Sequence, residues 1–120
     1  MAKYTKILFV TISGERMRVK AEGSEFDTGG VDREDVAGAN DFGYTEKPRV
    51  AMAKFTLLHV AGTSIVRFSR MTDEDIGIET DTGDQWTMAD SWSTGEVKLS
   101  DGEVPLEFHC DPKNVTEDVA

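Results

Sequence analysis

Alternating apolar and polar positions characterise the start of the chain. The segment 6–12 (KILFVTI) is rich in β-branched and aromatic residues, which is typical of a buried strand. After the pair Ser13 and Gly14, Met17 and Val19 alternate with charged residues. A period of two that follows a two-residue break containing glycine predicts a β-hairpin, with Met17 and Val19 facing the core.

Residues 26–48 show neither a helical period nor a strand period. The segment contains several acidic residues and four glycines, Gly29, Gly30, Gly38 and Gly43. We therefore expect a long loop over residues 27–48. A loop of about twenty residues is uncommon inside a compact domain and is usually functional or mobile. A surface insertion without a role is the alternative.

A strand pattern returns at residues 49–60, after Pro48. There Val50, Met52 and Phe55 are expected to face inward, with the alternation less regular after that point.

One short helix is predicted at residues 64–71. Thr63 or Ser64 can cap its N-terminus, and Ile65 and Phe68 recur at helical spacing on one face.

From residue 75 onward the pattern alternates between strands and turns. The expected order is a strand from residue 75, a turn at 81–84, a strand at 85–92, a turn at 101–102 and a strand at 104–110. Pro105 cannot donate to a ladder, so the last strand either lies at a sheet edge or turns this position away from a partner.

These elements predict a mainly β fold. We expect a small β-sandwich or barrel of about six or seven antiparallel strands with one short flanking α-helix and a long loop. Residues 1–110 would form the single domain, and the polar residues 111–120 a loose acidic C-terminal tail. Trp86 and Trp92 are expected to be core or interface anchors.

Length and composition are consistent with one globular domain. The chain has 120 residues, of which 38% are hydrophobic, and a chain of this length buries enough surface for a core. Its single cysteine, Cys110, excludes an intrachain disulfide framework. The apolar run 7–10 is too short for a membrane span or for the core of a signal peptide.

Charge is distributed unevenly along the chain. Residues 1–71 carry 11 basic and 9 acidic residues (+2), whereas residues 72–120 carry 2 basic and 14 acidic residues (−12), which together give the net charge of −10. A protein this acidic is poorly suited to bind nucleic acid through its phosphates. The asymmetry fits docking between copies and an acidic surface that repels polyanions, and it fits general solubility equally well, since composition alone does not choose between them.

The sequence offers no catalytic constellation. Neither His59 nor His109 has another ligand at metal-binding spacing, and the acidic run 73–75 lacks the arrangement of a calcium loop. Cys110 continues an inward-facing alternation, which predicts a core residue rather than a nucleophile. No glycine-rich segment matches a phosphate-binding pattern. We therefore expect no enzyme, no cofactor and no metal ion.

Two neighbouring stretches resemble a known family. The segment 29–38 reads GGVDREDVAG and the segment 42–48 reads FGYTEKP. Tail tube proteins of Mu-like phages have a similar (K/D)RE-x-VAG segment followed by GY-x-E-x-P, after an N-terminal hairpin. The hairpin with Gly83 and Trp86 and the segment 95–108 are also similar. The resemblance covers about residues 5–110.

This resemblance implies a structural subunit of a phage tail tube. Members of the family form six-fold rings that stack into a hollow tube, through which the genome passes into the host. It also implies a place in the virion tail, synthesis in the bacterial host cytoplasm, and sheath, baseplate and tail terminator proteins as further partners. Two alternatives remain. One is the tube of a phage-derived bacteriocin or secretion-like apparatus, and the other is a monomeric β-barrel binding module.

Two groups of residues are candidates for this function. In the long loop, Arg33, Glu34 and Tyr44 are expected to form an arm that reaches a neighbouring ring, since an aromatic side chain and an arginine are good anchors. Acidic residues of the C-terminal strands are expected to line the lumen and to repel DNA phosphates, so that DNA passes without specific binding. The candidate lumen acids are Asp75, Glu79, Asp84 and Glu107.

Overall fold

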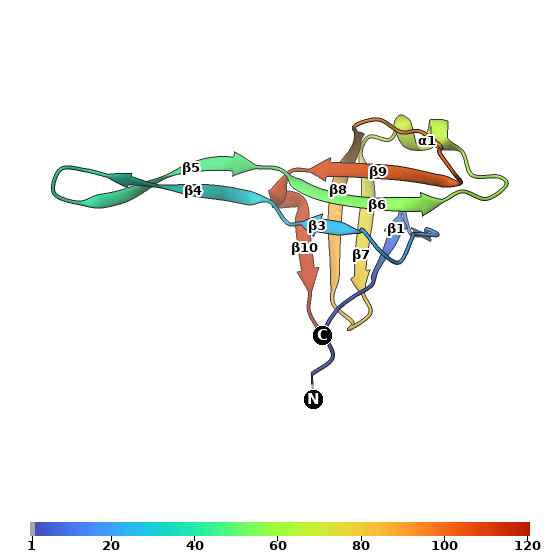
Figure 1. The fold of residues 1–120 in the computed structure, drawn as a ribbon, viewed down its shortest axis with the longest axis horizontal. Coiled ribbons are helices and arrows are strands. Elements are labelled where there is room, and N and C mark those ends of the chain that lie inside the picture. The colour runs from blue at the N-terminus through green and yellow to red at the C-terminus, as the bar shows by residue number, and fades with distance from the viewer. Residues whose placement is uncertain (1) are drawn as a thin grey trace.

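The computed structural model of this chain describes residues 2–120 and consists mainly of antiparallel strands with one short helix (Figure 1). The strands are β1 (Leu8–Ile12), β2 (Glu15–Arg16), β3 (Glu25–Asp27), β4 (Gly30–Ala37), β5 (Phe42–Arg49), β6 (Ala51–Leu58), β7 (Glu74–Thr80), β8 (Gln85–Thr94), β9 (Glu103–Cys110) and β10 (Val115–Asp118). Helix α1 spans Ile65–Ser69, and a single 3₁₀ turn, η1, spans Pro112–Asn114. The predicted mainly β fold with one short helix is confirmed.

Eight strands form one sheet in the order β2-β1-β7-β8-β9-β6-β3, with β10 also paired to β8. The first half of β8 pairs with β7 and β10, whereas its last residues pair with β9. In Figure 1, β7, β8 and β10 run steeply across β6 and β9, so the sheet folds over on itself at β8. Over residues 2–120 the result is sandwich-like and not a closed barrel, with ten strands rather than six or seven.

A bulge in β8 marks the corner of the folded sheet. Asp90 has a positive φ of 53°, and the register between β7 and β8 shifts between Glu74 and Ile76. One extra residue on β8 bends the strand locally and reverses which side chains face inward. Met88 is therefore buried before the bulge and Ser91 after it, whereas Asp90 is exposed.

The core lies between the two halves of the folded sheet. Phe55 of β6 and Phe108 of β9 stack in it with ring centroids 5.9 Å apart. Ile76 and Ile78 of β7 and Met88 of β8 are also buried. Removal of these side chains from water is the main favourable contribution to folding. The buried residues of β9 are Val104, Leu106, Phe108 and Cys110, so the predicted inward-facing position of Cys110 is confirmed.

The inward face of β6 differs from the predicted one. Its buried side chains belong to the odd-numbered residues from Ala51 to Leu57. The prediction is therefore right for Phe55 but wrong for Val50 and Met52, which are only partly buried. Alanines carry half of the buried positions here, and alanine is a weaker hydrophobic signal than valine or methionine.

The N-terminal hairpin and the helix form where they are predicted. Ser13 and Gly14 join β1 to β2 with φ values of 51° and 82°, the handedness that suits a two-residue hairpin turn. The hydroxyl of Ser64 accepts a hydrogen bond from the backbone N–H of Arg67 at 3.3 Å and so caps α1. Phe68 buries the inner side of this helix in the core.

Pro105 lies in an interior strand, since β9 has β8 on one side and β6 on the other. The predicted edge position is therefore wrong, and the alternative applies. Pro105 is opposite Thr56, whose carbonyl accepts from Lys20 and so points away from β9. On the other side, pairing with β8 ends at Glu107. The missing N–H of Pro105 thus interrupts no ladder.

The last ten residues do not form a loose tail, contrary to the prediction. Strand β10 pairs with β8, the indole N–H of Trp86 donates to the carboxylate of Glu117 at 2.7 Å, and the backbone N–H of Ala120 donates to Asp84 at 2.9 Å. These partners are 31 and 36 residues apart in the chain, so the local composition of the segment does not reveal them.

Candidate subunit interface

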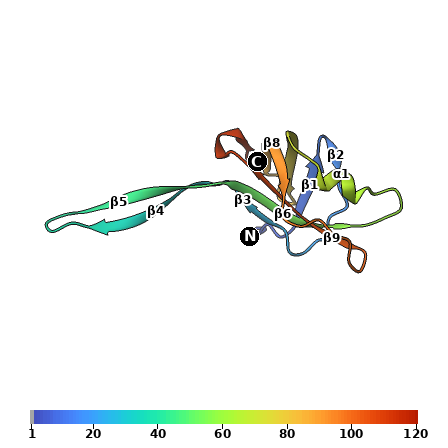
Figure 2. The ribbon, with the colours of Figure 1, turned by 90° about the horizontal axis from the view of Figure 1, so that it is seen from above.

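Residues 30–49, where a loop is predicted, form a long β-hairpin that we call the arm. Strands β4 and β5 pair along their full length, from Gly30 opposite Arg49 to Ala37 opposite Phe42. Figure 2 shows the arm projecting away from all the other strands. The predicted loop over 27–48 is therefore wrong in conformation.

The arm escapes prediction because neither of its faces is buried. All of its strand residues except Gly30 are exposed. Alternation of apolar and polar residues arises when one face of a strand packs on a core and the other meets water. A hairpin with two exposed faces is therefore not expected to show this alternation.

The arm also gives the molecule far more surface than its mass requires. The principal extents are 64 × 41 × 25 Å, and the radius of gyration is 17.1 Å, against about 14 Å for a compact domain of this length. The accessible surface is 8069 Å², against about 6,400 Å² for a compact protein of 13.2 kDa. The excess, roughly 1,700 Å², is close to the total area that a standard protein–protein interface buries.

The two faces of the arm differ in character. Arg33, Phe42 and Tyr44 share one face, on which the Arg33 guanidinium lies 5.6 Å from the centroid of the Tyr44 ring. Glu34 projects from the opposite face, beside Thr45. The structure thus brings together two of the three predicted arm residues, Arg33 and Tyr44, and places Glu34 behind them. Their role between subunits stays a prediction.

Phe42 is a further interface candidate, beyond the predicted Arg33, Glu34 and Tyr44. Its side chain is 86% exposed at the end of the arm, against 60% for Tyr44 and 47% for Val36. The turn before Phe42 is closed by a hydrogen bond from the Gly38 N–H to the Asp41 carbonyl at 2.7 Å. Glycine, asparagine and aspartate between two runs that contain valine and aromatic residues were the available signal for this hairpin tip.

A charged cluster holds the arm where it leaves the body. Arg49 donates hydrogen bonds to Asp32 on β4 and, at 3.1 Å, to Asp27 on β3. Asp27 also accepts the backbone N–H of Gly29 at 2.9 Å. The charge of Asp27, followed by that of Asp32, raises the pKa of Arg49 above its already high ordinary value. This permanently charged cluster links three strands and sets the direction of the arm.

The backbone at Gly29 lies very close to the backbone of residues 49–51. Its φ is 71°, and a Cβ at this position would lie 2.6 Å from the backbone nitrogen of Ala51 and 2.8 Å from the carbonyl oxygen of Arg49. Both contacts are with backbone atoms, which cannot rotate aside. The start of the arm therefore requires glycine.

The four candidate lumen acids lie in two separate places on the molecule. Asp75 and Glu79 project from the outer face of β7, where Glu79 pairs with Arg16 at 3.1 Å, and Asp84 lies in the turn that follows this strand. Glu107 projects from the outer face of β9, in the other half of the folded sheet, 2.7 Å from His109. The structure does not bring Glu107 together with the other three.

The two tryptophans have different surroundings. Trp86 is partly buried and packs against Phe26, with ring centroids 5.2 Å apart. Trp92 is 40% exposed and lines an open groove of about 680 Å³ at the base of the arm, together with Val31 and Pro112. Exposed apolar side chains of this size are typical of interaction surfaces.

Metal-binding clusters are absent from the part of the chain that the structure describes. Across residues 2–120, no three His, Cys, Asp or Glu side chains gather in a way that would hold a metal ion. Cys110 is fully buried, as predicted for a core residue, and burial raises the pKa of its thiol. The same residues include no helix long and apolar enough to span a membrane.

Comparison with known proteins gives consistent results from sequence and structure. The family model for phage tail tube proteins matches residues 1–114. The tail tube protein of Escherichia phage Mu is 30% identical over 103 residues, which are 83% of this chain and 84% of that protein. The Mu-like prophage FluMu tail tube protein of Haemophilus influenzae is 32% identical over 81 residues, 67% of this chain and 69% of its own length.

A solved structure shares the fold at much lower identity. The sheath/tube terminator of an extracellular contractile injection system, in its extended state, superposes with a TM-score of 0.71 at 10% identity. The superposition covers 99% of this chain and 98% of the terminator. The arm and the folded sheet are therefore one fold unit.

Proposed function

Because this chain belongs to the phage tail tube protein family and is a structural component of a virion tail, we propose that its copies form six-fold rings, that the rings stack into a hollow tube, and that the genome passes through this tube into the host. The subunit is made in the host cytoplasm and acts as a structural element rather than as a catalyst. Sheath, baseplate and terminator proteins are its further partners.

The observation that carries this proposal is the uncovered arm. Its strands are eight residues long, exposed on both faces, and carry Phe42 and Tyr44 at their outer end. A two-stranded hairpin is at best marginally stable alone in water, so it gains most of its stability from a partner. Contact with a neighbouring subunit supplies that cover and uses two different surfaces of each copy, as stacking requires.

Charge supports the second part of the proposal. The chain carries a net charge of −10, and 14 of its 23 acidic residues lie after residue 71. An acidic lumen repels DNA phosphates and lets the genome slide without binding. Screening limits this repulsion to about 8 Å at physiological salt, which is the range at which DNA inside a narrow tube meets its wall.

Electron microscopy of the purified protein at rising concentration tests the assembly. We expect isolated subunits at low concentration, then annular particles, then tubes of constant diameter. Sedimentation measured on the same samples follows the transition in solution. Isolated particles at every concentration and salt would contradict the assignment of rings and would favour a monomeric binding module.

Charge reversal tests which surface lines the lumen. We expect the triple variant Asp75→Lys, Glu79→Lys and Asp84→Lys to assemble normally but to slow genome ejection on the order of tenfold or more, because the change of six charge units per subunit (three changes of two) leaves three positive charges that attract phosphates. The measurement is infectious titre per assembled particle. Glu107→Lys, on the other half of the sheet, gives the comparison for the second surface.

A matched control separates lumen charge from total charge. The triple variant Glu22→Lys, Glu96→Lys and Asp101→Lys changes the net charge equally at exposed positions of loops and turns. We expect it to eject the genome at the normal rate. Equal effects of both triple variants would show that net charge, and not the β7 surface, governs passage.

A further inference from the structure

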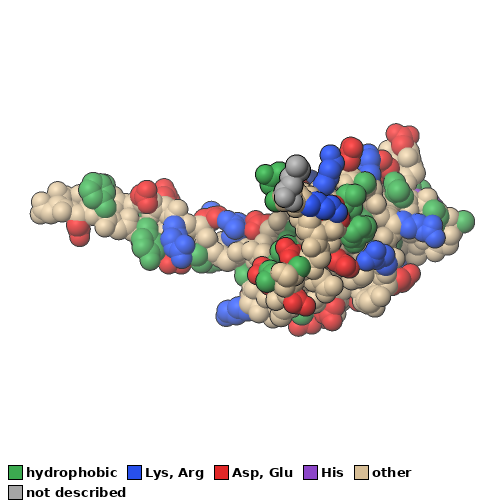
Figure 3. Space-filling model, turned by 90° about the horizontal axis from the view of Figure 1, so that it is seen from below, with side chains coloured by type: hydrophobic (Ala, Val, Ile, Leu, Met, Phe, Trp, Pro, Cys, Tyr) green, Lys and Arg blue, Asp and Glu red, His purple; other side chains and the backbone are tan. Residues whose placement is uncertain are grey.

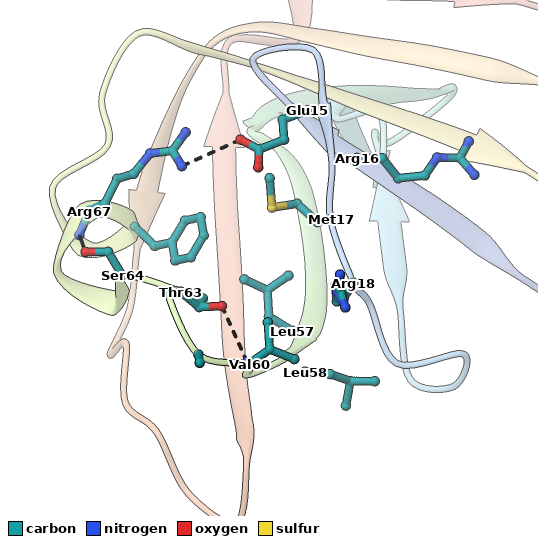
Figure 4. A pocket seen from close by; sticks show the side chains of 13 residues that line it. Glu15, Arg16, Met17, Arg18, Leu57, Leu58, Val60, Thr63, Ser64 and Arg67 are labelled. Carbon is teal, nitrogen blue, oxygen red and sulfur yellow. Dashed lines mark hydrogen bonds and ion pairs between the residues drawn. The ribbon is translucent and has the colours of Figure 1, made fainter.

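The body of the molecule has a pocket between the N-terminal hairpin, the end of β6 and helix α1. Its volume is about 420 Å³, within the range of roughly 300–1,000 Å³ that is usual for small-ligand sites. Figure 4 shows Met17, Leu57 and Val60 gathered around it. Leu58 and Val60 at its rim are 43% and 42% exposed, so one part of the lining is apolar and uncovered, beside charged and hydroxyl side chains.

Arginines lie in the wall of the pocket beside these apolar side chains. Arg67 and Arg18 both contribute to the wall. None of the ion pairs within residues 2–120 includes Arg18. Arg67 forms an ion pair with Glu15 at 3.8 Å (Figure 4). Both side chains are exposed, and an exposed ion pair contributes little free energy, so Arg67 can exchange Glu15 for another carboxylate. The pocket therefore fits an apolar group that carries a neighbouring negative charge.

The end of the arm has the complementary character. Residues 34–45 contain three acidic residues, Glu34, Asp35 and Asp41, and no basic one. Asp41 directly precedes Phe42, whose ring is 86% exposed. Figure 3 likewise shows apolar and acidic side chains along the outer part of the arm and basic ones nearer the body.

The arm and the pocket lie at opposite ends of the molecule. In Figure 1 the arm extends from one end of β6, whereas helix α1 and the last residues of β6 lie at the other end. The arm points away from the pocket along the longest dimension of the molecule, which is 64 Å, so the arm cannot reach the pocket of its own chain. A contact between the two joins one copy head to tail with the next, and repetition of that contact gives closed rings or an extended stack.

We propose that this pocket is the seat for the arm of a second copy, with the Phe42 ring in the apolar part and the Asp41 carboxylate against Arg18 and Arg67. The proposal rests on the proposed assembly and specifies which surface receives the arm. A buried aromatic anchor beside a charged pair is the arrangement that concentrates binding energy at protein interfaces. The groove beside Trp92 at the base of the arm is the competing seat.

Disulfide trapping in assembled tubes tests the seat. The double variant Ala39→Cys and Ala61→Cys places one thiol in the tip turn and one in the wall of the pocket. Under mild oxidation we expect a ladder of covalent multimers on a non-reducing gel, because each copy joins two others. Cys110 stays silent because it is fully buried. The matched control, Ala39→Cys with Lys113→Cys, places the second thiol at the Trp92 groove instead.

The outcomes separate this proposal from the assembly itself. A ladder with Ala61→Cys and none with Lys113→Cys supports the seat. Tubes that cross-link only through Lys113→Cys, or through neither position, overturn the seat and leave the assembly standing. Failure of the unaltered protein to form rings or tubes overturns both.

Alanine substitution measures how much the anchor contributes. We expect Phe42→Ala to raise the protein concentration needed for assembly at least about thirtyfold, the loss typical of a buried aromatic anchor. Tyr4→Ala is the matched control, since Tyr4 is also an aromatic residue with 86% of its side chain exposed. Equal losses for both variants, or no loss for Phe42→Ala, would overturn the seat.

Discussion

Replacement of residues 33–46 by Asn-Gly is expected to give a folded, soluble protein that forms no tubes at any concentration. The two-residue turn closes the hairpin at Asp32 and Lys47, which are opposite each other in the arm, so the strands at its base keep their pairing. The deleted residues are all exposed and add nothing to the core. Stability should therefore change little, whereas the surface that we propose to join copies is lost.

Circular dichroism and urea unfolding establish that this variant is folded, and electron microscopy measures its assembly. A β-sheet signal reduced only by the loss of the arm strands, and an unfolding free energy within about 1 kcal/mol of that of the unaltered protein, are the expected control results, since exposed segments contribute little to stability. Full-length tubes from this variant would refute the role of the arm. Single rings without stacking would assign the arm to contacts between rings alone.

Substitution of Gly29 by alanine is the change with the second-largest expected effect. It places a Cβ against the backbone of Arg49 and Ala51 and holds a non-glycine residue at a φ of 71°. The left-handed conformation costs about 1–2 kcal/mol and the overpacking about 1–3 kcal/mol more. We expect urea unfolding to show a loss of about 2–5 kcal/mol, together with loss of assembly.

Gly43→Ala provides the control within the same arm. Gly43 has no positive φ, and within residues 2–120 no heavy atom outside its chain neighbours lies within 4 Å of a Cβ built there. The unfolding free energy of the Gly43→Ala variant should stay within about 0.5 kcal/mol of that of the unaltered protein. Equal losses at both positions would mean that the close approach at Gly29 is not what fixes the base of the arm.

The elements that the sequence predicts well have one buried face. In β7, Ile76 and Ile78 alternate with exposed or partly exposed residues because the strand packs on the core from one side only. The cap at Ser64 and the turn at Ser13 are equally local, since both depend on residues within four positions. Such signals are complete within a short window of sequence.

The elements that the sequence predicts poorly depend on distant partners or on none. Strand β10 forms because β8 offers an edge and Trp86 a donor, and neither is visible in the last ten residues. Both faces of the arm strands are exposed beyond Gly30, so no core imposes a period on them. The candidate lumen acids separate onto two surfaces because the corner at Asp90 turns β9 away from β7, which no local pattern indicates.

The placement of the arm at one end of the molecule, opposite helix α1, has a consequence for the finished tube. If every copy presents its arm in the same sense, the polymer is polar, and its two termini expose different chemistry. One terminus displays unengaged hairpins, whereas the other displays unfilled receiving surfaces. A capping protein that binds the unengaged hairpins does not bind the unfilled receiving surfaces. Initiation and length control can therefore act at separate ends of the same tube.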